Sequence, residues 1–285
     1  MVKDSDILGL GVTAAQTNDK RPKRVKYSGS KFLAFDGVNE YGELLGSNSE
    51  TFMDAIGTTG GTISFWVRSS DFYPATNNQY SYMIGGYAFS LPDVSSFYIA
   101  TRNDSGTNRI VIVRSDLNIF TSTFTTWADF KSVSADDLTD DTWHHIAVTI
   151  KPFSSSWRTL LYVDGAAVSV TKLTNSVNAS NSSSPANSNM VMTMARYNTI
   201  YDQFDLNEVA MWSSELSASE ISYIYNQGLS GFDFTRNFSD YTSKDDLYAW
   251  YKMGDDPDST TSLEPDSSGN DRDMTLYNSP DRSSH

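Results

Sequence analysis

Cysteine is absent from the 285-residue sequence. Its absence excludes disulfide bonds, thiolate metal sites and cysteine nucleophiles, so any bound ion would have to be a hard cation held by oxygen ligands. The sequence also lacks an apolar run of about 18 residues and a basic-then-apolar N-terminus that ends at small residues. We therefore expect neither a membrane-spanning helix nor a secretory signal.

Histidine is scarce, with only His144, His145 and His285. Because neighbouring side chains of a strand point to opposite faces, we expect one of the first two to pack inward and the other to face solvent. Two side chains so placed cannot share a metal ion or form a catalytic pair. The sequence gives no support to serine-hydrolase chemistry.

Positive charge is also in short supply, since 21 Lys and Arg face 35 Asp and Glu, for a net charge of −14. This balance argues against nucleic-acid binding, which needs clustered basic residues. Residues 1–31 are the exception, with a net charge of +4 that leaves −18 for the rest. Residues 1–30 are therefore either a solvated tail or an extended arm that anchors to an acidic partner surface. The anchoring residues would be Lys20, Arg21, Lys23, Arg24 and Lys26.

Aromatic residues, in contrast, make up 13% of the chain. Many lie in short runs rich in β-branched residues, separated by Gly, Pro, Asn, Asp or Ser, which is typical of antiparallel all-β proteins. The clearest runs are Thr62–Arg68, Ser96–Ala100, Arg109–Arg114, Thr142–Ile150, Thr159–Asp164, Ala167–Thr171 and Met190–Ala195.

Two local motifs predict specific elements. Asp164-Gly165 lies between two of these runs and predicts a β-hairpin. Ser217 and Glu220 have the spacing of a capping box, and Ile221 and Ile224 follow at helical spacing. A single short helix is therefore expected late in the chain, ending near Gly228.

Several stretches, in this order, resemble the laminin-G-like branch of the concanavalin A-like lectin/glucanase superfamily. They are Leu33–Tyr41, Thr62–Val67, Thr142–Val148, Leu161–Gly165, Ala195–Tyr197, Leu206–Trp212 and Leu216–Ile221. The resemblance implies an all-β fold, a two-sheet antiparallel jelly-roll sandwich with one short late helix.

The C-terminal stretches Asp246–Gly254 and Asp266–Asp271 resemble a segment that precedes the first strand in many family members. Either residues 245–285 complete a domain spanning 31–285, as in a circular permutation, or a second copy begins there. We favour completion, because roughly 40 residues cannot bury a sandwich core alone.

The resemblance also implies a structural Ca²⁺. The matching positions are Asp36, Asn39, Asp205 and Asn207, with Asp266 as a further ligand. Their oxygen atoms suit calcium. The alternative for Asp36 is a turn residue before Gly37.

Aromatic residues beside loop-like segments are candidates for stacking on sugar rings. They are Tyr73, Tyr80, Tyr82 and Trp157. The alternative is that these rings pack in the core. The carboxylate pattern of the superfamily's glucanases, Glu-x-Asp-x-Glu, does not occur, so we expect no enzyme activity.

Three function classes follow. The first is a non-enzymatic virion structural protein, like those that bacteriophages, marine ones especially, use as capsid decorations, fibres or tail appendages. Such a protein would assemble in the host cytoplasm with other virion proteins and with further copies of itself, anchored by residues 1–30, and would contact host glycans. The second is a carbohydrate-binding adhesin module at a bacterial surface; a degenerate glycan-processing enzyme is a third reading. No nucleic-acid or membrane partner is expected.

Overall fold

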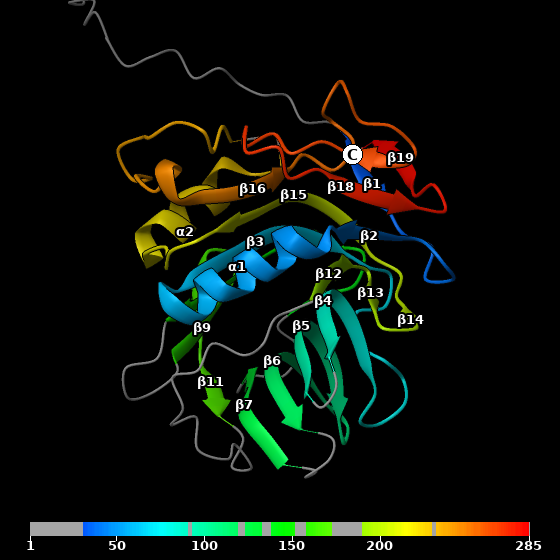
Figure 1. The fold of residues 1–285 in the computed structure, drawn as a ribbon. Coiled ribbons are helices and arrows are strands. Elements are labelled where there is room, and N and C mark those ends of the chain that lie inside the picture. Colours follow the sequence, from blue (N-terminus) through cyan, green and yellow to red (C-terminus); the bar gives the residue numbers. More distant parts are fainter. Residues whose placement is uncertain are drawn as a thin grey trace, which may run out of the picture.

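The protein is a sandwich of two antiparallel sheets, seen here in a computed structural model that describes residues 31–90, 93–118, 123–132, 138–151, 158–172, 190–229 and 232–284 (Figure 1). The predicted two-sheet jelly-roll class is confirmed. The first sheet has the order β10-β9-β8-β3-β15-β1-β19, with β16 paired to β15. Its strands are β10 (Ala166–Val168), β9 (Arg158–Val163), β8 (His144–Lys151), β3 (Gly61–Arg68), β15 (Asp205–Trp212), β1 (Lys31–Ala34), β19 (Asp281–Ser284) and β16 (Leu247–Tyr251).

The second sheet has the order β11-β7-β6-β5-β4-β12-β2-β18-β17. Its strands are β11 (Val170–Lys172), β7 (Thr123–Ser132), β6 (Thr107–Asn118), β5 (Asp93–Asp104), β4 (Tyr80–Ser90), β12 (Val191–Met194), β2 (Tyr41–Leu44), β18 (Met274–Tyr277) and β17 (Leu263–Glu264). A separate hairpin of β13 (Arg196–Tyr197) and β14 (Ile200–Tyr201) follows β12.

Helix α1 (Gly46–Thr58) lies beside the sandwich core and was not predicted. It buries Ser49, Phe52, Met53 and Ile56, whose spacing places them on one face of a helix. The N-cap position is Leu45, which makes no side-chain capping bond. The sequence therefore lacks the start signal that marked the later helix. None of the helices in the described part of the chain is both long and apolar enough to cross a membrane.

Helix α2 (Ala218–Gln227) begins at the predicted capping box, in which Ser217 and Glu220 each bind the other's backbone N–H. With residues 232–241 it covers the outer face of the first sheet. Ile221, Ile224 and Trp250 pack there against Trp212, whose indole N–H donates to the Tyr241 hydroxyl at 2.9 Å. Strands at the centre of the first sheet are therefore buried on both faces.

Because this layer of α2 and the following segment covers the sheet, the prediction for the two neighbouring histidines is wrong. His144 and His145 were expected to lie one inward and one in solvent, but both are buried, with 7% and 0% of their surface exposed. Their rings do point to opposite faces, since His144 packs on Phe72 and His145 on Tyr225 of α2. Both faces of β8 are therefore covered at these two positions.

The hairpin predicted at Asp164-Gly165 is confirmed, because the two residues join β9 to β10. Their φ angles of 50° and 74° are those of a tight hairpin turn. Gly165 is also held close to α2, where an added Cβ would lie 2.7 Å from the Tyr225 ring. Glycine meets both requirements.

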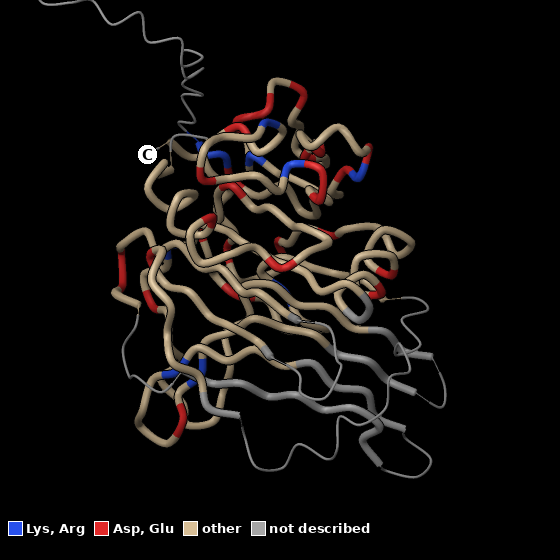
Figure 2. Tube along the Cα trace, turned by 90° about the vertical axis from the view of Figure 1, so that its left-hand side faces the viewer, with Lys and Arg blue, Asp and Glu red and all other residues tan. Residues whose placement is uncertain are grey.

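Residues 247–284 contribute strands to both sheets. β16 pairs with β15 and β19 with β1 in the first sheet, while β18 pairs with β2 in the second. Figure 1 shows these C-terminal strands beside the blue N-terminal ones. The adjoining loops carry many acidic residues, which gather at this end of the molecule in Figure 2.

Candidate functional site

Eight tyrosines, half of the protein's 16, form two contacting groups on the outward side of the second sheet and on the β13–β14 hairpin. We call this surface the tyrosine strip. The first group is Tyr80, Tyr82, Tyr87, Tyr98 and Tyr197, and the second is Tyr41, Tyr201 and Tyr277.

Tyr82 lies at the centre of the first group. Its ring stacks on Tyr197, with centroids 4.7 Å apart and planes at 21°, and meets Tyr98 edge-on at 5.1 Å and 87°. Tyr80 stacks on its other side at 5.7 Å. Tyr82 is itself buried, while Tyr80, Tyr98 and Tyr197 remain half-exposed. The result is a rigid aromatic surface with hydroxyl groups.

Gly85 lets the β13–β14 hairpin lie directly over β4. A Cβ at this position would lie 2.6 Å from the carbonyl oxygen of Arg196 and 3.2 Å from the Tyr197 side chain. Any larger residue would push the hairpin away from the sheet, so Gly85 sets the height of Tyr197 above Tyr82.

Asp202 fixes the base of the hairpin. Its Oδ2 accepts the backbone N–H of Tyr82 at 2.8 Å, and its own N–H donates to the carbonyl of Ala195 at 3.0 Å. Burial raises the pKa of Asp202 to about 6. One carboxyl therefore joins the hairpin to the strand that carries the central ring.

The second group lies across β2, β18 and the hairpin. Tyr41 stacks on Tyr277 with centroids 4.3 Å apart and planes at 4°. The guanidinium carbon of Arg196 lies 4.1 Å from the centre of the Tyr41 ring, while the Glu43 carboxylate is 3.9 Å from its Nη1. Arg196 thus links the two groups, because it contacts Tyr41 of the second group and directly precedes Tyr197 of the first group in the sequence.

Two of the four aromatic residues predicted for sugar contact, Tyr80 and Tyr82, belong to the strip. Tyr73 packs instead against the core between the sheets, and Trp157 lies outside the described residues. The sequence interpretation missed Tyr98, whose place in Ser96–Ala100 alternates with the core residues Phe97 and Ile99. That alternation was the signal available for it.

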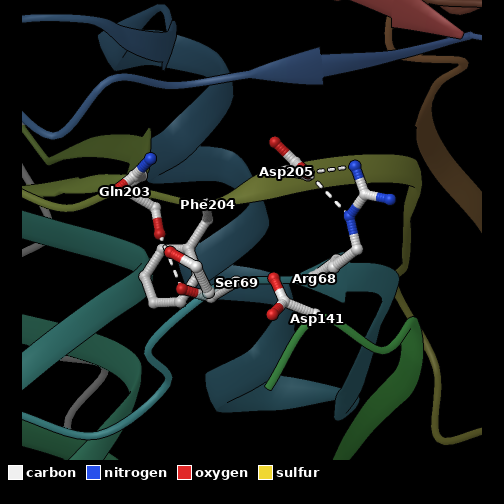
Figure 3. Close-up of a pocket in the computed structure, with 7 residues that line it drawn as sticks. Arg68, Ser69, Asp141, Gln203, Phe204 and Asp205 are labelled. Atoms are coloured by element: carbon white, nitrogen blue, oxygen red, sulfur yellow. Dashed lines mark hydrogen bonds and ion pairs between the residues drawn. The ribbon is translucent and has the colours of Figure 1, made fainter. Parts of the chain in front are cut away.

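A polar hollow of about 180 Å³, the Arg68 hollow, opens beside the start of β15 (Figure 3). Arg68 crosses it and donates from Nε and Nη2 to Oδ2 of Asp205 at 2.8 and 2.6 Å. The lining residues are Arg68, Ser69, Ser70, Asp141, Gln203, Phe204 and Asp205.

The residues predicted to bind calcium make hydrogen bonds or ion pairs with other residues of the chain. Oδ1 of Asp36 accepts the backbone N–H of Val38, Asn39 and Glu40, as in a turn, and Asp205 binds Arg68. Asn207 is fully buried, and its side chain accepts the N–H of Glu208. Asp266 accepts the N–H of Trp250 and Arg272.

The carboxylates among these positions do not form one group. Nowhere in the described ranges do three or more His, Cys, Asp or Glu side chains form a group able to hold a metal, which includes the carboxylates of Asp36, Asp205 and Asp266. Calcium therefore rests on the family resemblance alone and stays a prediction.

A serine–histidine pair lies inside the first sheet, where Oγ of Ser64 is 2.8 Å from Nε2 of His145. Both residues are buried, with 1% and 0% of their surface exposed. Burial also lowers the pKa of His145 to about 4. A substrate cannot reach this pair, so it serves packing and not catalysis.

Residues 45–222, well over half of the chain, match the family described as the concanavalin A-like lectin/glucanases superfamily. The chain belongs to this superfamily. A comparison with curated proteins finds no match.

Several solved structures are similar to the chain at low sequence identity. A protein from Bacteroides ovatus whose proposed role is carbohydrate binding is 14% identical, with a TM-score of 0.47 over 90% of this chain and 60% of that one. A CBM40 of a Ruminococcus gnavus sialidase bound to sialyllactose is 13% identical, with a TM-score of 0.45 over 70% of this chain and 99% of that one. A tailspike domain of bacteriophage CBA120 is 11% identical, with a TM-score of 0.44 over 68% of this chain and 26% of that one. At these identities the likeness concerns the fold alone.

Proposed function

We propose that this superfamily member binds glycans through the tyrosine strip and does not cleave them. The observation that carries the proposal is the packed array around Tyr82 on the outward face of the second sheet. Aromatic faces suit the apolar C–H faces of sugar rings, while phenolic hydroxyls suit sugar hydroxyls. Rings that already pack on one another lose little further conformational entropy when a ligand binds.

Two arginines supply directional groups along the strip. The guanidinium carbon of Arg102 lies 5.1 Å from the centre of the Tyr80 ring, and its Nη2 donates to Oδ1 of Asn78 at 2.9 Å. Arg196 lies over Tyr41 in the second group. Planar guanidinium donors beside aromatic faces favour ligands that combine flat apolar surface with hydroxyl oxygens.

Glycan binding by the tyrosine strip is tested with Tyr98→Ala, which removes one half-exposed ring. We expect Tyr98→Ala to weaken binding to an immobilised glycan library at least tenfold, or about 1.4 kcal/mol. The matched control is Tyr223→Ala, because Tyr223 lies on α2 at the other sheet and packs on Phe232. Thermal melting of both variants verifies that they fold.

Failure to bind any glycan, or equal binding by wild type and Tyr98→Ala, would contradict the proposal. Release of reducing sugar from a bound glycan would contradict the non-enzymatic part.

We further propose that the lectin-like body is displayed on a virion as a capsid decoration, fibre or tail appendage. The support is the charge contrast between residues 1–30, with Lys20, Arg21, Lys23, Arg24 and Lys26, and the acidic remainder. Opposite charges favour docking of this segment on an acidic shell protein or on another copy of the chain. The segment lies outside the described residues. A cell-surface adhesin is the alternative.

Virion display is tested by removing residues 1–30. We expect the sandwich to fold and bind glycan as before but to be missing from purified particles analysed by mass spectrometry. Incorporation at the wild-type level, or absence of the full-length chain from particles, would favour the adhesin.

A further inference from the structure

We propose that the Arg68 hollow is a second ligand site, separate from the tyrosine strip, and that it takes a single neutral sugar residue. The inference rests on the proposed glycan binding and adds a place and a ligand class to it. The observation behind it is a small hollow lined by polar residues, three of whose side chains have no hydrogen-bond partner in the described part of the chain.

Three of these side chains make no hydrogen bond to any other residue in the described part of the chain. They are the Asp141 carboxylate, the Gln203 amide and the Ser70 hydroxyl, and all three residues are exposed. Arg68 uses Nε and Nη2 on Asp205, which leaves Nη1 as a further donor. Donors and acceptors therefore surround the same space, as Figure 3 shows for Asp141 below Arg68.

The backbone that carries these groups is held in place. Ser69 Oγ donates to the carbonyls of Gln203 at 3.1 Å and Asp71 at 3.0 Å, and the Asp141 N–H donates to the Ser69 carbonyl at 2.7 Å. Three separate segments of the chain thus meet at Ser69. The hollow is therefore preorganised, which lowers the entropy cost of ligand binding.

Arg68 is positioned as firmly as the backbone. Its guanidinium carbon lies 4.9 Å from the centre of the Phe32 ring and 5.1 Å from that of Trp143. These contacts and the bond to Asp205 leave the guanidinium plane little freedom to turn. The remaining donor therefore keeps a fixed direction.

The charges of the lining select the class of ligand. One guanidinium and the two carboxylates of Asp141 and Asp205 give a formal charge of −1. The two carboxylates would repel an anion, and the Arg68 guanidinium would repel a cation. The described residues also offer no third acidic group that could help to hold a metal. Neutral hydroxyls both donate and accept, so vicinal hydroxyls of a sugar can use all of these groups.

The size of the hollow limits the ligand to one residue. Its volume of about 180 Å³ is below the roughly 300–1,000 Å³ of pockets that enclose drug-sized ligands. Asp202, which anchors the strip, is followed directly by Gln203 of the hollow, so the two sites adjoin but use different side chains.

The experiment titrates the full chain with the neutral methyl glycosides of glucose, galactose and mannose, followed by protein NMR. Asp141→Asn keeps the shape of the side chain, and Asn tolerates the φ of 57° at this position. We expect Asp141→Asn to weaken binding at least tenfold and Ser70→Trp, which fills the hollow, to abolish it. Asp258→Asn, at an exposed site elsewhere, should bind these glycosides as wild type does.

Three results would overturn the inference. The first is no binding of any of these glycosides at up to about 50 mM, well above a millimolar Kd. The second is binding lost in Tyr98→Ala but kept in Asp141→Asn, which would place the sugar on the strip and leave the proposed function standing. The third is stronger binding of glucosamine or sialic acid, which would show a charged ligand. Loss of oligosaccharide binding in Tyr98→Ala tests the strip independently of all three.

Discussion

The carboxylate of Asp164 accepts a hydrogen bond from Nδ1–H of His144 at 2.8 Å. The ring nitrogen is assigned as a donor because Nε2 of the same ring accepts the backbone N–H of Thr139 at 2.8 Å. The other oxygen of Asp164 accepts the N–H of His145 at 2.9 Å. The first residue of the β9–β10 turn therefore also satisfies two buried donors of β8.

Replacing Asp164 should be costly for stability. We expect Asp164→Ala to lower the free energy of unfolding by about 3 kcal/mol, because it leaves two buried donors without an acceptor and puts alanine at a φ of 50°. Asp164→Asn is the control, since asparagine tolerates this φ and keeps an acceptor oxygen. Urea unfolding measures both, and an equal loss in the two variants would refute this account of the turn.

Glu208 should make stability fall as the pH rises. Its Oε2 accepts the indole N–H of Trp250 at 2.7 Å, while its buried Oε1 has no hydrogen-bond partner among the described residues. Burial raises the pKa of Glu208 from 4.5 to about 8. Between these values the folded state holds a proton that the unfolded state has lost, so the free energy of unfolding decreases with increasing pH.

Glu208→Gln keeps the acceptor for Trp250 but cannot ionise. We expect this variant to melt higher than wild type at pH 8, with a difference that shrinks towards pH 4.5. Glu215→Gln, placed before α2, should leave the wild-type pH dependence in place. A Glu208→Gln curve parallel to that of wild type across this range would rule out Glu208 as the cause.

Asp202 should also make the stability of the protein fall with rising pH, but over a lower pH range than Glu208. Its pKa is about 6 in the folded protein against 3.8 for an ordinary aspartate. Stability should therefore fall as the pH rises from about 4 to 6, and Asp202→Asn should be more stable than wild type at pH 7 by roughly 1–2 kcal/mol. Melting at pH 4 and pH 7 measures the effect. The same gain in Asp240→Asn, at an exposed position, would show a general effect of negative charge instead.

Alanine substitutions at two adjacent glycines of β4 test whether the position of the β13–β14 hairpin matters for glycan binding. Gly85→Ala should displace the β13–β14 hairpin, because its methyl group would lie 2.6 Å from the Arg196 carbonyl, and glycan binding should fall at least tenfold. At Gly86 the nearest atom is the flexible Met190 sulfur, at 3.3 Å, so Gly86→Ala should bind as wild type does. Equal affinity of both variants would show that the hairpin does not shape the ligand surface.

Local signals explain which parts of the fold could be predicted. The Asp164-Gly165 turn and the Ser217–Glu220 capping box involve residues a few positions apart, and both appear where the sequence indicated. β4 was missed, because Tyr80 and Tyr82 follow a polar stretch and Gly85-Gly86 interrupts the run. Pairing with β5 and β12 stabilises β4 as a strand, although its local sequence has weak strand propensity.

The candidate site could be predicted only in part for a related reason. Tyr41 and Tyr277 stack although they lie at opposite ends of the chain, and Arg196 reaches Tyr41 from a hairpin in between. No sequence spacing reveals such contacts. The burial of His145 likewise depends on Tyr225 of α2, which reaches the sheet from a distant part of the sequence.

The pairing of β1 with β19 has a consequence for biosynthesis. Lys31 lies opposite Ser284 in this ladder, and β2 pairs with β18 across a similarly long separation in sequence. As the polypeptide leaves the ribosome, β1 and β2 emerge long before β19 and β18, so each strand lacks one of its neighbours until those later strands have been made. Contacts between residues so far apart in sequence form slowly, and open strand edges can pair with other chains. The nascent protein therefore depends on late closure, and chaperone binding during synthesis would protect it from aggregation.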